Sequence, residues 1–478
     1  MTIVKRTNRA SAAPAARLGG SARLGGAAAS LVATLFWAGA AFAQDDAPKL
    51  DTGNTAWVMT SSALVLMMTL PGLALFYAGL VRAKNALSLF MQCLVSAGVV
   101  GVLWIVVGYS LSFGTGNAVI GDLSKLGLGG IDMNTLWGTT GIPEYLFVMF
   151  QAMFAIITPA LMIGAFAERM RFGPYLAFIT IWLLVVYCPL AHMVWGGGWI
   201  GTMGAKDFAG GLVVHMSSGY SALVAAIFLG KRRGFGREPM PPHNLPFAVI
   251  GAALLWVGWF GFNAGSALAA DGYAGLAFLT TSTAASTALV TWLLIEWVHR
   301  GKPTVLGAAT ALVAGLVAIT PACAFVTPMG SIAVGIGVSV LCYAAVTFLK
   351  PRLGYDDSLD VFGVHGVGGT WGALATGLFI ADFALPEGVT WGQQVMKQLG
   401  SIAFTAIFAP AATLVILLGL RAAFGSLRVD EEAEFEGIDL AEHSESAYVF
   451  GTSSGSPAST LEPAAHGAPL GVTRERTA

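Results

Sequence analysis

The chain has 478 residues, of which 56% are hydrophobic and 11% are charged, against roughly 45–50% and 25% in a soluble domain. This composition excludes an ordinary soluble enzyme and favours a protein that buries its apolar surface in lipid. The 25 basic and 26 acidic residues give a formal net charge of −1, which excludes the strongly basic surface of a nucleic-acid-binding protein. The four cysteines lie inside apolar runs, where we expect small buried side chains rather than disulfides.

The first 43 residues have the pattern of a secretory signal peptide. Basic residues between Lys5 and Arg23 precede a short apolar run, which ends in Ala41-Phe42-Ala43. A basic segment, a short apolar segment and a small-residue site are typical of a cleaved signal. A first membrane helix is the alternative, but the run is shorter than the roughly 20 residues that span a bilayer. We predict cleavage after Ala43, which places the mature N-terminus outside the cytoplasm.

From residue 56 onward the sequence predicts eleven membrane spans in a membrane domain of residues 44–424. Loops on one side of these spans carry fourteen Lys or Arg residues and loops on the other side carry four. The positive-inside rule therefore places the C-terminus in the cytoplasm and the N-terminus outside. We predict an all-α integral membrane protein. The predicted spans are residues 56–80, 88–112, 144–167, 174–195, 211–230, 246–268, 274–298, 305–325, 330–349, 360–381 and 398–420.

The composition changes after the last predicted span. Residues 425–450 are acidic but include large apolar side chains such as Phe435 and Ile438. Such a segment is either a solvated tail or a regulatory tail that docks on the cytoplasmic face. Residues 451–478 have the composition of a disordered extension.

Two histidines lie inside predicted spans, where an ionisable side chain usually marks a path or a site. His215 is in the fifth span and His365 in the tenth. Each has an acid upstream, Asp207 or Asp360, and a glycine four residues downstream. These shared features predict two related halves of five spans each. The second half is inverted because five is odd, and the eleventh span is an addition.

A pair of intramembrane histidines has three chemical uses. The two rings can hold a haem as axial ligands, bind a metal ion, or line a pore and relay a proton. A metal site is disfavoured because neither histidine has a second ligand at useful spacing. A haem pair usually comes from facing helices of a bundle rather than from repeat-equivalent points. A satisfied core histidine remains an alternative to all three.

Aromatic residues gather toward the predicted outer ends of the spans. Trp195 closes the fourth span, Phe154 lies near the outer end of the third, and Phe262 and Ser266 follow in the sixth. An indole face beside a hydroxyl attracts a small cation through the ring quadrupole. Aromatic belts are common at membrane interfaces, however, and on composition alone a belt residue is the simpler interpretation of Trp195.

Taken together, these motifs resemble the ammonium transporter (Amt/Mep/Rh) family, most closely its bacterial branch. Eight blocks match in family order across residues 56 to 450, which is far more specific than any single block. They are PGLALFYAGLVRAKN, FQAMFAIITPALMIGAFAERM, AHMVWGGGW, DFAGGLVVHMSSG, LLWVGWFGFNAGSA, AITPACAFV, DVFGVHGVGGTWGAL and LRVDEEAEFEGIDLAEHSESAY.

The resemblance implies an outer recruitment site and a gate. Trp195 and Ser266 are similar to the family's residues that recruit ammonium, with Phe154 beside them. Asp207 matches the acid that supports this region and is needed for transport. Phe154 and Phe262 match the stacked gate beneath the site.

The resemblance also implies a pore. His215 and His365 are similar to the twin histidines that line the family's apolar pore and relay a proton, and Trp259 and Thr320 match residues near the conduction path. The family implies a homotrimer in the bacterial inner membrane that takes up ammonium, with methylammonium as an analogue. It also implies a tail that contacts P-II-type signal proteins. No enzyme activity, cofactor or metal is expected.

Three other functions stay open at this point. A sensor would use the same pore but signal through residues 425–450 to a P-II-type protein. A membrane redox protein would use His215 and His365 as haem ligands. A passive gas channel of the Rh type would conduct ammonia without charge.

Overall fold

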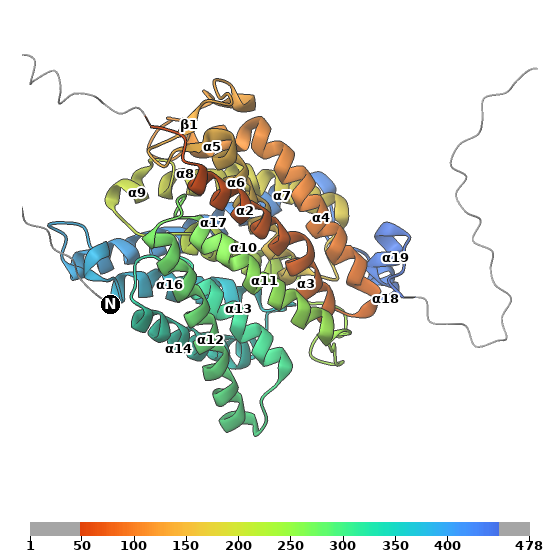
Figure 1. Cartoon of the computed structure of the whole chain (residues 1–478). Coiled ribbons are helices and arrows are strands. Elements are labelled where there is room, and N and C mark those ends of the chain that lie inside the picture. The colour runs from red at the N-terminus through yellow and green to blue at the C-terminus, as the bar shows by residue number, and fades with distance from the viewer. Residues whose placement is uncertain (1–47, 449–478) are drawn as a thin grey trace, which may run out of the picture. The chain divides into compact units, whose positions relative to one another are not determined.

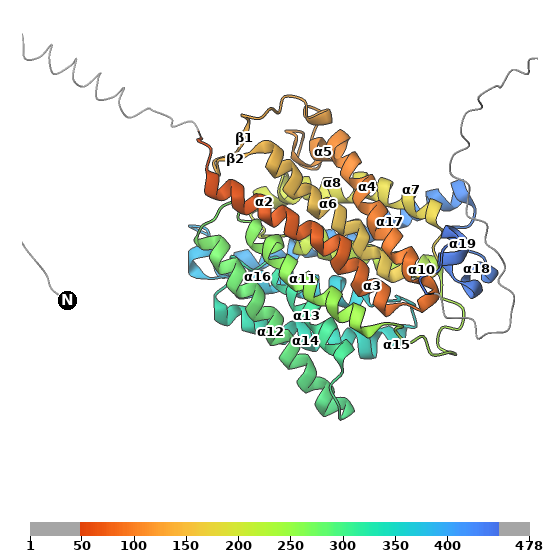
Figure 2. The ribbon, with the colours of Figure 1, turned by 45° about the vertical axis from the view of Figure 1, so that its right-hand side comes forward.

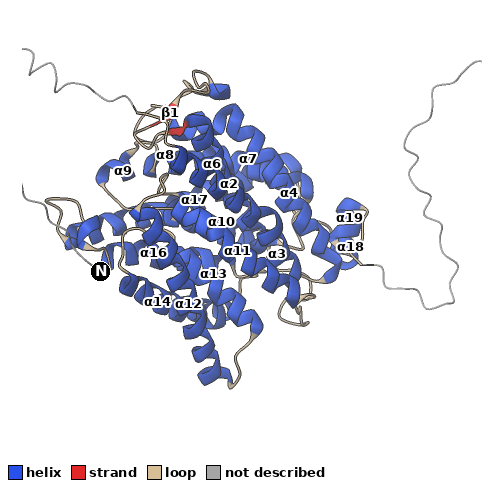
Figure 3. Cartoon of the chain, in the orientation of Figure 1, coloured by secondary structure: helices blue, strands red, loops and turns tan. Residues whose placement is uncertain are grey.

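The computed structural model describes residues 48–448. The predicted signal peptide at residues 1–43 and the predicted extension at residues 451–478 lie outside the described residues. Helices make up most of the described part, as Figure 3 shows, and its only strands are the two-residue β1 (Leu136–Trp137) and β2 (Ile142–Pro143), which pair antiparallel. The predicted all-helical fold is confirmed.

Most helices follow one another with short connections, and two longer connections are residues 114–143, which contain both strands, and residues 230–244 (Figure 1). In the N-terminal part they are α2 (Thr52–Met67), η1 (Met68–Leu73), α3 (Ala74–Leu80), η2 (Ala83–Asn85), α4 (Ala86–Leu103), η3 (Trp104–Gly108), α5 (Tyr109–Phe113), η4 (Leu126–Leu128), α6 (Glu144–Phe166), α7 (Phe172–Trp182), η5 (Leu183–Tyr187), α8 (Cys188–Val194), α9 (Trp199–Met203), η6 (Gly211–Met216) and α10 (Ser217–Leu229). In the C-terminal part they are α11 (Leu245–Gly265), α12 (Gly272–Arg300), α13 (Val305–Ile319), α14 (Pro328–Ala344), η7 (Ala345–Leu349), α15 (Lys350–Leu353), η8 (Phe362–Gly366), α16 (Val367–Leu378), η9 (Asp382–Ala384), α17 (Trp391–Phe424), α18 (Glu431–Glu436) and α19 (Ile438–His443).

Nine helical segments within residues 48–448 are long and apolar enough to cross a membrane. They correspond to nine of the eleven predicted spans. The other two are helical but shorter: α13 has 15 residues, and residues 360–381 contain η8 and α16. Helix α13 ends where the chain turns, with Ala322 N donating to Ile319 O at 2.9 Å. The count of eleven stays a prediction.

Helix α6 lies at the centre of the bundle. Of its 23 residues, 19 are buried, so α6 contacts other helices on nearly every side. It packs against α2, α4 and α10, and α2 packs in turn against α11 (Figure 2). By contrast, α12 and α17 expose large apolar side chains such as Val298 and Ile407. Exposed apolar faces of this kind are expected where helices meet lipid or another subunit.

A buried network of carboxylates and guanidinium groups ties several loops together at the end of the bundle that carries α18 and α19. Glu168 accepts hydrogen bonds from Arg82 Nε at 3.1 Å, Asn85 Nδ2 at 2.9 Å and Arg232 NH1 at 3.0 Å. Arg232 also pairs with Asp356 at 2.9 Å. Burial raises the pKa of Glu168, but Arg232 and Arg82 outweigh burial and hold that pKa below its ordinary value.

Residues 425–448 dock onto this end of the bundle. Backbone hydrogen bonds join Val429 N to Arg169 O and Arg171 N to Leu427 O, both at 3.0 Å. The Asp439 carboxylate accepts from Ser88 N at 2.7 Å, at the start of α4. The segment therefore packs as an ordered part of the fold, while its regulatory role stays a prediction.

Candidate functional site

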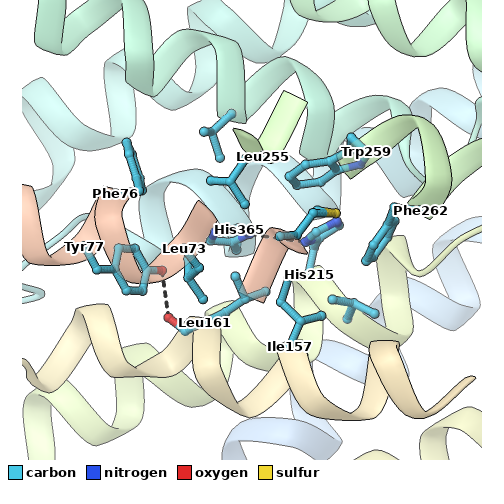
Figure 4. Close-up of a pocket in the computed structure, with 13 residues that line it drawn as sticks. Leu73, Phe76, Tyr77, Ile157, Leu161, His215, Leu255, Trp259, Phe262 and His365 are labelled. Atoms are coloured by element: carbon cyan, nitrogen blue, oxygen red, sulfur yellow. Dashed lines mark hydrogen bonds between the residues drawn. The ribbon is translucent and has the colours of Figure 1, made fainter. Parts of the chain in front are cut away.

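His215 and His365 meet in the interior of the bundle. Their Nδ1 atoms lie 3.2 Å apart, and the ring centroids are 5.3 Å apart with 24° between the planes. His215 is 1% exposed and His365 4%. Figure 4 shows the two rings end to end in an apolar cavity, with Trp259 and Phe262 on one side and Phe76 and Tyr77 on the other. The structure therefore joins two side chains that are 150 positions apart in sequence.

Each histidine lies in a π-helical turn, His215 in η6 and His365 in η8. Four other turns within residues 48–448, η1, η3, η5 and η7, are also π-helical, so the turn type alone does not mark the site. The composition of these stretches does not distinguish a π-helical turn from an α-helical one, so sequence analysis predicted a span but not this turn.

Two glycines bring the histidine-bearing helices together. A Cβ atom on Gly219 would lie 2.1 Å from Gly366 N, and one on Gly369 would lie 3.0 Å from His215 Cβ. Each glycine thus packs against the turn that carries the opposite histidine. This close approach explains why a glycine follows each histidine four residues later in the sequence.

We expect Gly219→Ala to lower the free energy of unfolding by about 1–3 kcal/mol, the usual cost of overpacking a core. The added methyl group would separate η8 from α10 and break the contact between the two Nδ1 atoms. Unfolding temperature in detergent and ammonium-evoked current in liposomes measure the two effects. Gly98→Ala in α4 is the matched control, because its Cβ meets nothing within 4 Å. Equal behaviour of the two variants would contradict this account of Gly219.

Asp207 caps the start of η6 from within the protein. Its carboxylate accepts hydrogen bonds from the backbone N–H groups of residues 210–213, at distances of 2.6–3.2 Å. Burial raises the pKa of Asp207, and these four donors oppose the rise. Asp207 also fixes the recruitment region, because its backbone oxygen accepts a hydrogen bond from Trp195 Nε1 at 2.8 Å.

The counterpart of Asp207 is Asp357, not the predicted Asp360. Asp357 accepts from Val361 N at 3.1 Å and from Phe362 N at 2.8 Å, at the start of η8. Asp360 instead pairs with Lys350 at 2.6 Å. Sequence analysis paired Asp207 with Asp360 because Asp360 is the acid nearer to His365 in the sequence. Equal spacing would have found the correct one, because each capping acid precedes its histidine by eight positions.

The two predicted gate residues, Phe154 and Phe262, lie against each other beside His215. The Phe154 and Phe262 ring centroids are 4.3 Å apart, and both side chains are almost completely buried. Phe262 also stacks on His215, with centroids 6.0 Å apart and 26° between the planes. The Trp195 ring contacts Phe154 edge-on at 6.1 Å. The predicted gate residues are therefore in contact with both the recruitment residue and the histidine pair.

A cavity of about 330 Å³ lies on the far side of this gate from the histidine pair. Trp195 and Ser266 line it, as predicted from the resemblance. We call this cavity the vestibule. Its other lining residues are Phe113, Trp137, Phe147, Gln151, Phe154, Val194, Phe208 and Leu268.

The sequence matches the Ammonium Transporter Family over residues 56–448. An ammonium transporter of Bacillus subtilis (strain 168) is 48% identical over 404 residues, which cover 84% of this chain and 99% of that relative. Ammonium transporter Amt1 of Archaeoglobus fulgidus is 43% identical over 407 residues, covering 84% of this chain and 100% of that relative. The chain belongs to the ammonium transporter family.

Solved structures agree with this membership. The crystal structure of Candida albicans Mep2 matches with a TM-score of 0.74 and 38% identity, covering 80% of this chain and 88% of that chain. A structure described as a "Sensor Amt Protein" matches with a TM-score of 0.77 and 32% identity, covering 82% and 98%. The predicted resemblance is confirmed, and this member of the ammonium transporter family is a multi-pass membrane protein of the Amt/Mep fold.

Trp259 and Thr320 lie beside the histidine pair of this ammonium transporter family member. The Trp259 ring stacks on His215, with centroids 5.5 Å apart and 20° between the planes. Trp259 Nε1 donates to Thr320 Oγ1 at 2.8 Å. This bond satisfies the indole N–H and holds the ring against the imidazole.

Sequence analysis missed several residues of the site. Gln151 lies three positions before Phe154 on the same face of α6, so helical spacing would have found it. Trp137 lies in a connection between helices, where no periodicity marks it. Tyr77 lines the apolar cavity around the histidine pair, at the end away from Phe262. Its hydroxyl donates to Leu161 O at 2.9 Å.

The geometry does not suit a haem between the two histidines. Metal–nitrogen bonds are about 2 Å long, so axial ligands on opposite faces of a haem stand about 4 Å apart. The Nδ1 atoms are 3.2 Å apart, and the cavity around them measures about 10 Å³. Within residues 48–448, no group of three or more His, Cys, Asp or Glu side chains is placed to hold a metal ion.

Proposed function

We propose that this protein recruits ammonium at the vestibule, deprotonates it and conducts neutral ammonia through the apolar pore, with His215 and His365 relaying the proton. The contact between the two Nδ1 atoms inside an apolar cavity is the observation that carries the proposal. The physiological role would be nitrogen uptake across the bacterial inner membrane.

The cost of burying a charge favours conduction of the neutral form. An ammonium ion that enters a narrow apolar pore loses its hydration shell, and the penalty is several kcal/mol even after the protein relaxes. Neutral ammonia avoids most of this penalty. A potassium ion has no proton to release, so a pore that requires deprotonation excludes potassium.

The recruitment site offers the groups that an ammonium ion needs. The exposed part of the Trp195 ring presents a π face, which attracts cations. Ser266 donates its hydroxyl hydrogen to Phe262 O at 2.8 Å, so the hydroxyl oxygen keeps a lone pair to accept from an ammonium N–H. The rings of Phe154 and Phe262 must then move apart to admit the substrate, because their centroids are 4.3 Å apart.

The histidine pair supplies hydrogen-bonding groups along an otherwise apolar path. When both rings are neutral, one Nδ1 donates to the other, so one ring carries its hydrogen at Nδ1 and the other at Nε2. The Nε2 of His215 is buried and has no hydrogen-bond partner within residues 48–448. This atom is the free end of the pair, and it can exchange a proton with a substrate that passes the gate.

The proposal includes the finer topology predicted from sequence. Eleven spans with the N-terminus outside and the C-terminus in the cytoplasm agree with the distribution of basic loops. The paired π-helical turns, capping acids and glycines around His215 and His365 support two related halves. The homotrimer and the P-II-type partner rest on the family resemblance.

A sensory role is the second candidate. It is favoured by the similarity to the structure described as a "Sensor Amt Protein" and by the docking of residues 425–448. A chain that ends at residue 424 separates the two functions. Loss of binding to a P-II-type protein with an unchanged ammonium current would support a signalling role alongside transport. Binding that survives the truncation would contradict signalling through residues 425–448.

The test of transport is a current measurement on the full chain reconstituted in liposomes on a solid-supported membrane. A jump in ammonium or methylammonium concentration is expected to evoke a current, and a potassium jump is expected to evoke none. A silent ammonium jump with folded protein would overturn charge-coupled transport and favour neutral gas conduction or sensing.

A further inference from the structure

A cage formed by one carboxylate and two aromatic rings lies beside the vestibule. Glu144, at the start of α6, is 5% exposed and accepts a hydrogen bond from Tyr109 OH at 2.7 Å. The Lys125 ammonium group pairs with the same Glu144 oxygen. Lys125 Nζ lies 5.4 Å from the ring centroid of Tyr109 and 5.4 Å from that of Trp137. The chain thus surrounds one ammonium group with a carboxylate and two aromatic rings.

The walls of this cage are held by contacts that do not involve Lys125. Trp137 stacks on Phe147, with centroids 3.7 Å apart and 7° between the planes. Tyr109 packs edge-on against the same Phe147 ring at 6.3 Å. Glu144 N donates to Thr135 O at 2.8 Å. The cage would therefore keep its shape without the lysine side chain.

The backbone of Lys125 is fixed, while its side chain reaches solvent. Lys125 N donates to Ser110 Oγ at 3.0 Å, and Lys125 O accepts from Leu128 N at 2.9 Å. The Lys125 side chain is 27% exposed. A flexible four-carbon stem on a fixed backbone allows the ammonium group to leave the cage without moving the cage walls.

The ammonium group of lysine has the same recognition chemistry as the substrate. Both carry one positive charge and several N–H donors, and both bind to a carboxylate and to π faces. We propose that Glu144, Tyr109 and Trp137 form a second binding site for ammonium and small primary alkylammonium ions. In this structure Lys125 occupies the site with its own ammonium group and acts as a tethered competitor.

The cage adjoins the vestibule, because Trp137 lines both and Phe147, which also lines the vestibule, stacks on Trp137. Lys125 neutralises a carboxylate that would otherwise attract cations to this side of the gate. The inference goes beyond the proposed function, whose recruitment residues are Trp195 and Ser266. By this inference, Lys125 limits how many ammonium ions the protein binds outside its gate, because it occupies the second site itself.

The test is the thermal unfolding of full-length Lys125→Ala in detergent, at matched ionic strength, in ammonium, methylammonium, tetramethylammonium or potassium chloride. Ammonium and methylammonium are expected to raise the unfolding temperature of the variant by about 2–5 °C more than that of the unmutated protein, because a ligand stabilises the state that binds it. Tetramethylammonium, which has no N–H, and potassium are expected to give no such difference.

Two further variants test whether the extra stabilisation by ammonium comes from binding in the cage. Lys125→Ala/Glu144→Gln is expected to lose the extra stabilisation. Lys125→Ala/Trp195→Ala is expected to keep it, because Trp195 belongs to the recruitment site of the proposed function. The measurement reports equilibrium binding and does not require transport, so a failure of the cage and a failure of the transport mechanism are distinguishable.

Equal ammonium shifts in Lys125→Ala and the unmutated protein would overturn the inference. If Lys125→Ala aggregates in potassium chloride, the expected result is a monodisperse protein when methylammonium chloride is present throughout purification. Aggregation in both salts would also overturn it, because the cage would then have failed to bind the free ion in place of the lysine.

Discussion

His215→Ala/His365→Ala is expected to lower the ammonium-evoked current in liposomes by about 100-fold or more, the scale on which positioned proton-transfer groups act. The double substitution removes both ends of the 3.2 Å Nδ1 contact and leaves an apolar cavity without a hydrogen-bonding path. Ammonium-jump and potassium-jump currents on the same liposomes measure conduction and selectivity together.

His299→Ala is the matched control for the histidine pair. His299 is also hydrogen-bonded through a ring nitrogen, to Tyr343 OH at 2.7 Å, but it lines neither the vestibule nor the pore cavity. The ammonium-evoked current of His299→Ala is expected to stay near that of the unmutated protein. Full ammonium current with potassium still excluded in the double variant would show that the relay mechanism is wrong.

Glu168→Ala is expected to lower the free energy of unfolding by about 3–5 kcal/mol, the usual cost of removing one partner from a buried ion pair. The Glu168 side chain is 0% exposed, and it contacts both Arg82 and Arg232. Without it, these guanidinium groups lose their shared acceptor. Denaturant unfolding followed by circular dichroism measures the loss.

Glu387→Ala is the control for this prediction. Glu387 is exposed, and substitution of an exposed side chain without close partners usually changes stability by less than about 0.5 kcal/mol. A Glu168→Ala variant as stable as Glu387→Ala would mean that the network does not stabilise the fold.

The Glu168 network also has a defined acid dependence. An unperturbed glutamate has a pKa of about 4.3, and the pKa of Glu168 lies below its ordinary value in the folded protein. Its ionised form therefore contributes stability that is fully present above about pH 5 and is lost as the pH falls through the folded-state pKa. The unfolding temperature of Glu168→Gln is expected to fall less steeply below about pH 5 than that of the unmutated protein.

The two pore histidines were predictable because each lies in an apolar block where a polar side chain is unusual. His215 and His365 stand out against their neighbours for this reason, whereas Phe262 lies among other aromatic residues and was predicted from the family resemblance. Sequence analysis could not predict which atoms would meet, since the Nδ1 contact depends on how two distant helices cross. The vestibule wall was harder still, because Trp137 comes from a connection whose path follows tertiary packing rather than local pattern.

Some differences trace to particular local physics. The interpretation of Asp360 as a counterpart of Asp207 relied on proximity to the histidine, whereas helix capping depends on a fixed spacing from the first helical N–H groups. The span predicted at residues 305–325 ends as α13 at Ile319, because the apolar composition continues through residues 320–325, where the chain forms turns instead of a helix.

The π-helical turns at His215 and His365 have a consequence for changes in chain length. A π-helical turn holds one residue more than the α-helical turn it replaces. Deleting one residue from most positions in a span would rotate everything beyond it by about 100° and turn its faces away from their neighbours. The turns η6 and η8 follow loops directly and are continued only on their C-terminal side, by α10 and α16. Deleting one residue within residues 211–216 or 362–366 would therefore shorten the first turn and shift the histidine against its capping acid, Asp207 or Asp357, while the helix that follows keeps its own contacts.

In η1, η3, η5 and η7, by contrast, a π-helical turn lies between two α-helical segments, so there a one-residue deletion would restore an ordinary turn and keep both segments in register. The spans therefore tolerate a change of chain length at these four turns and not at the two that carry the histidines.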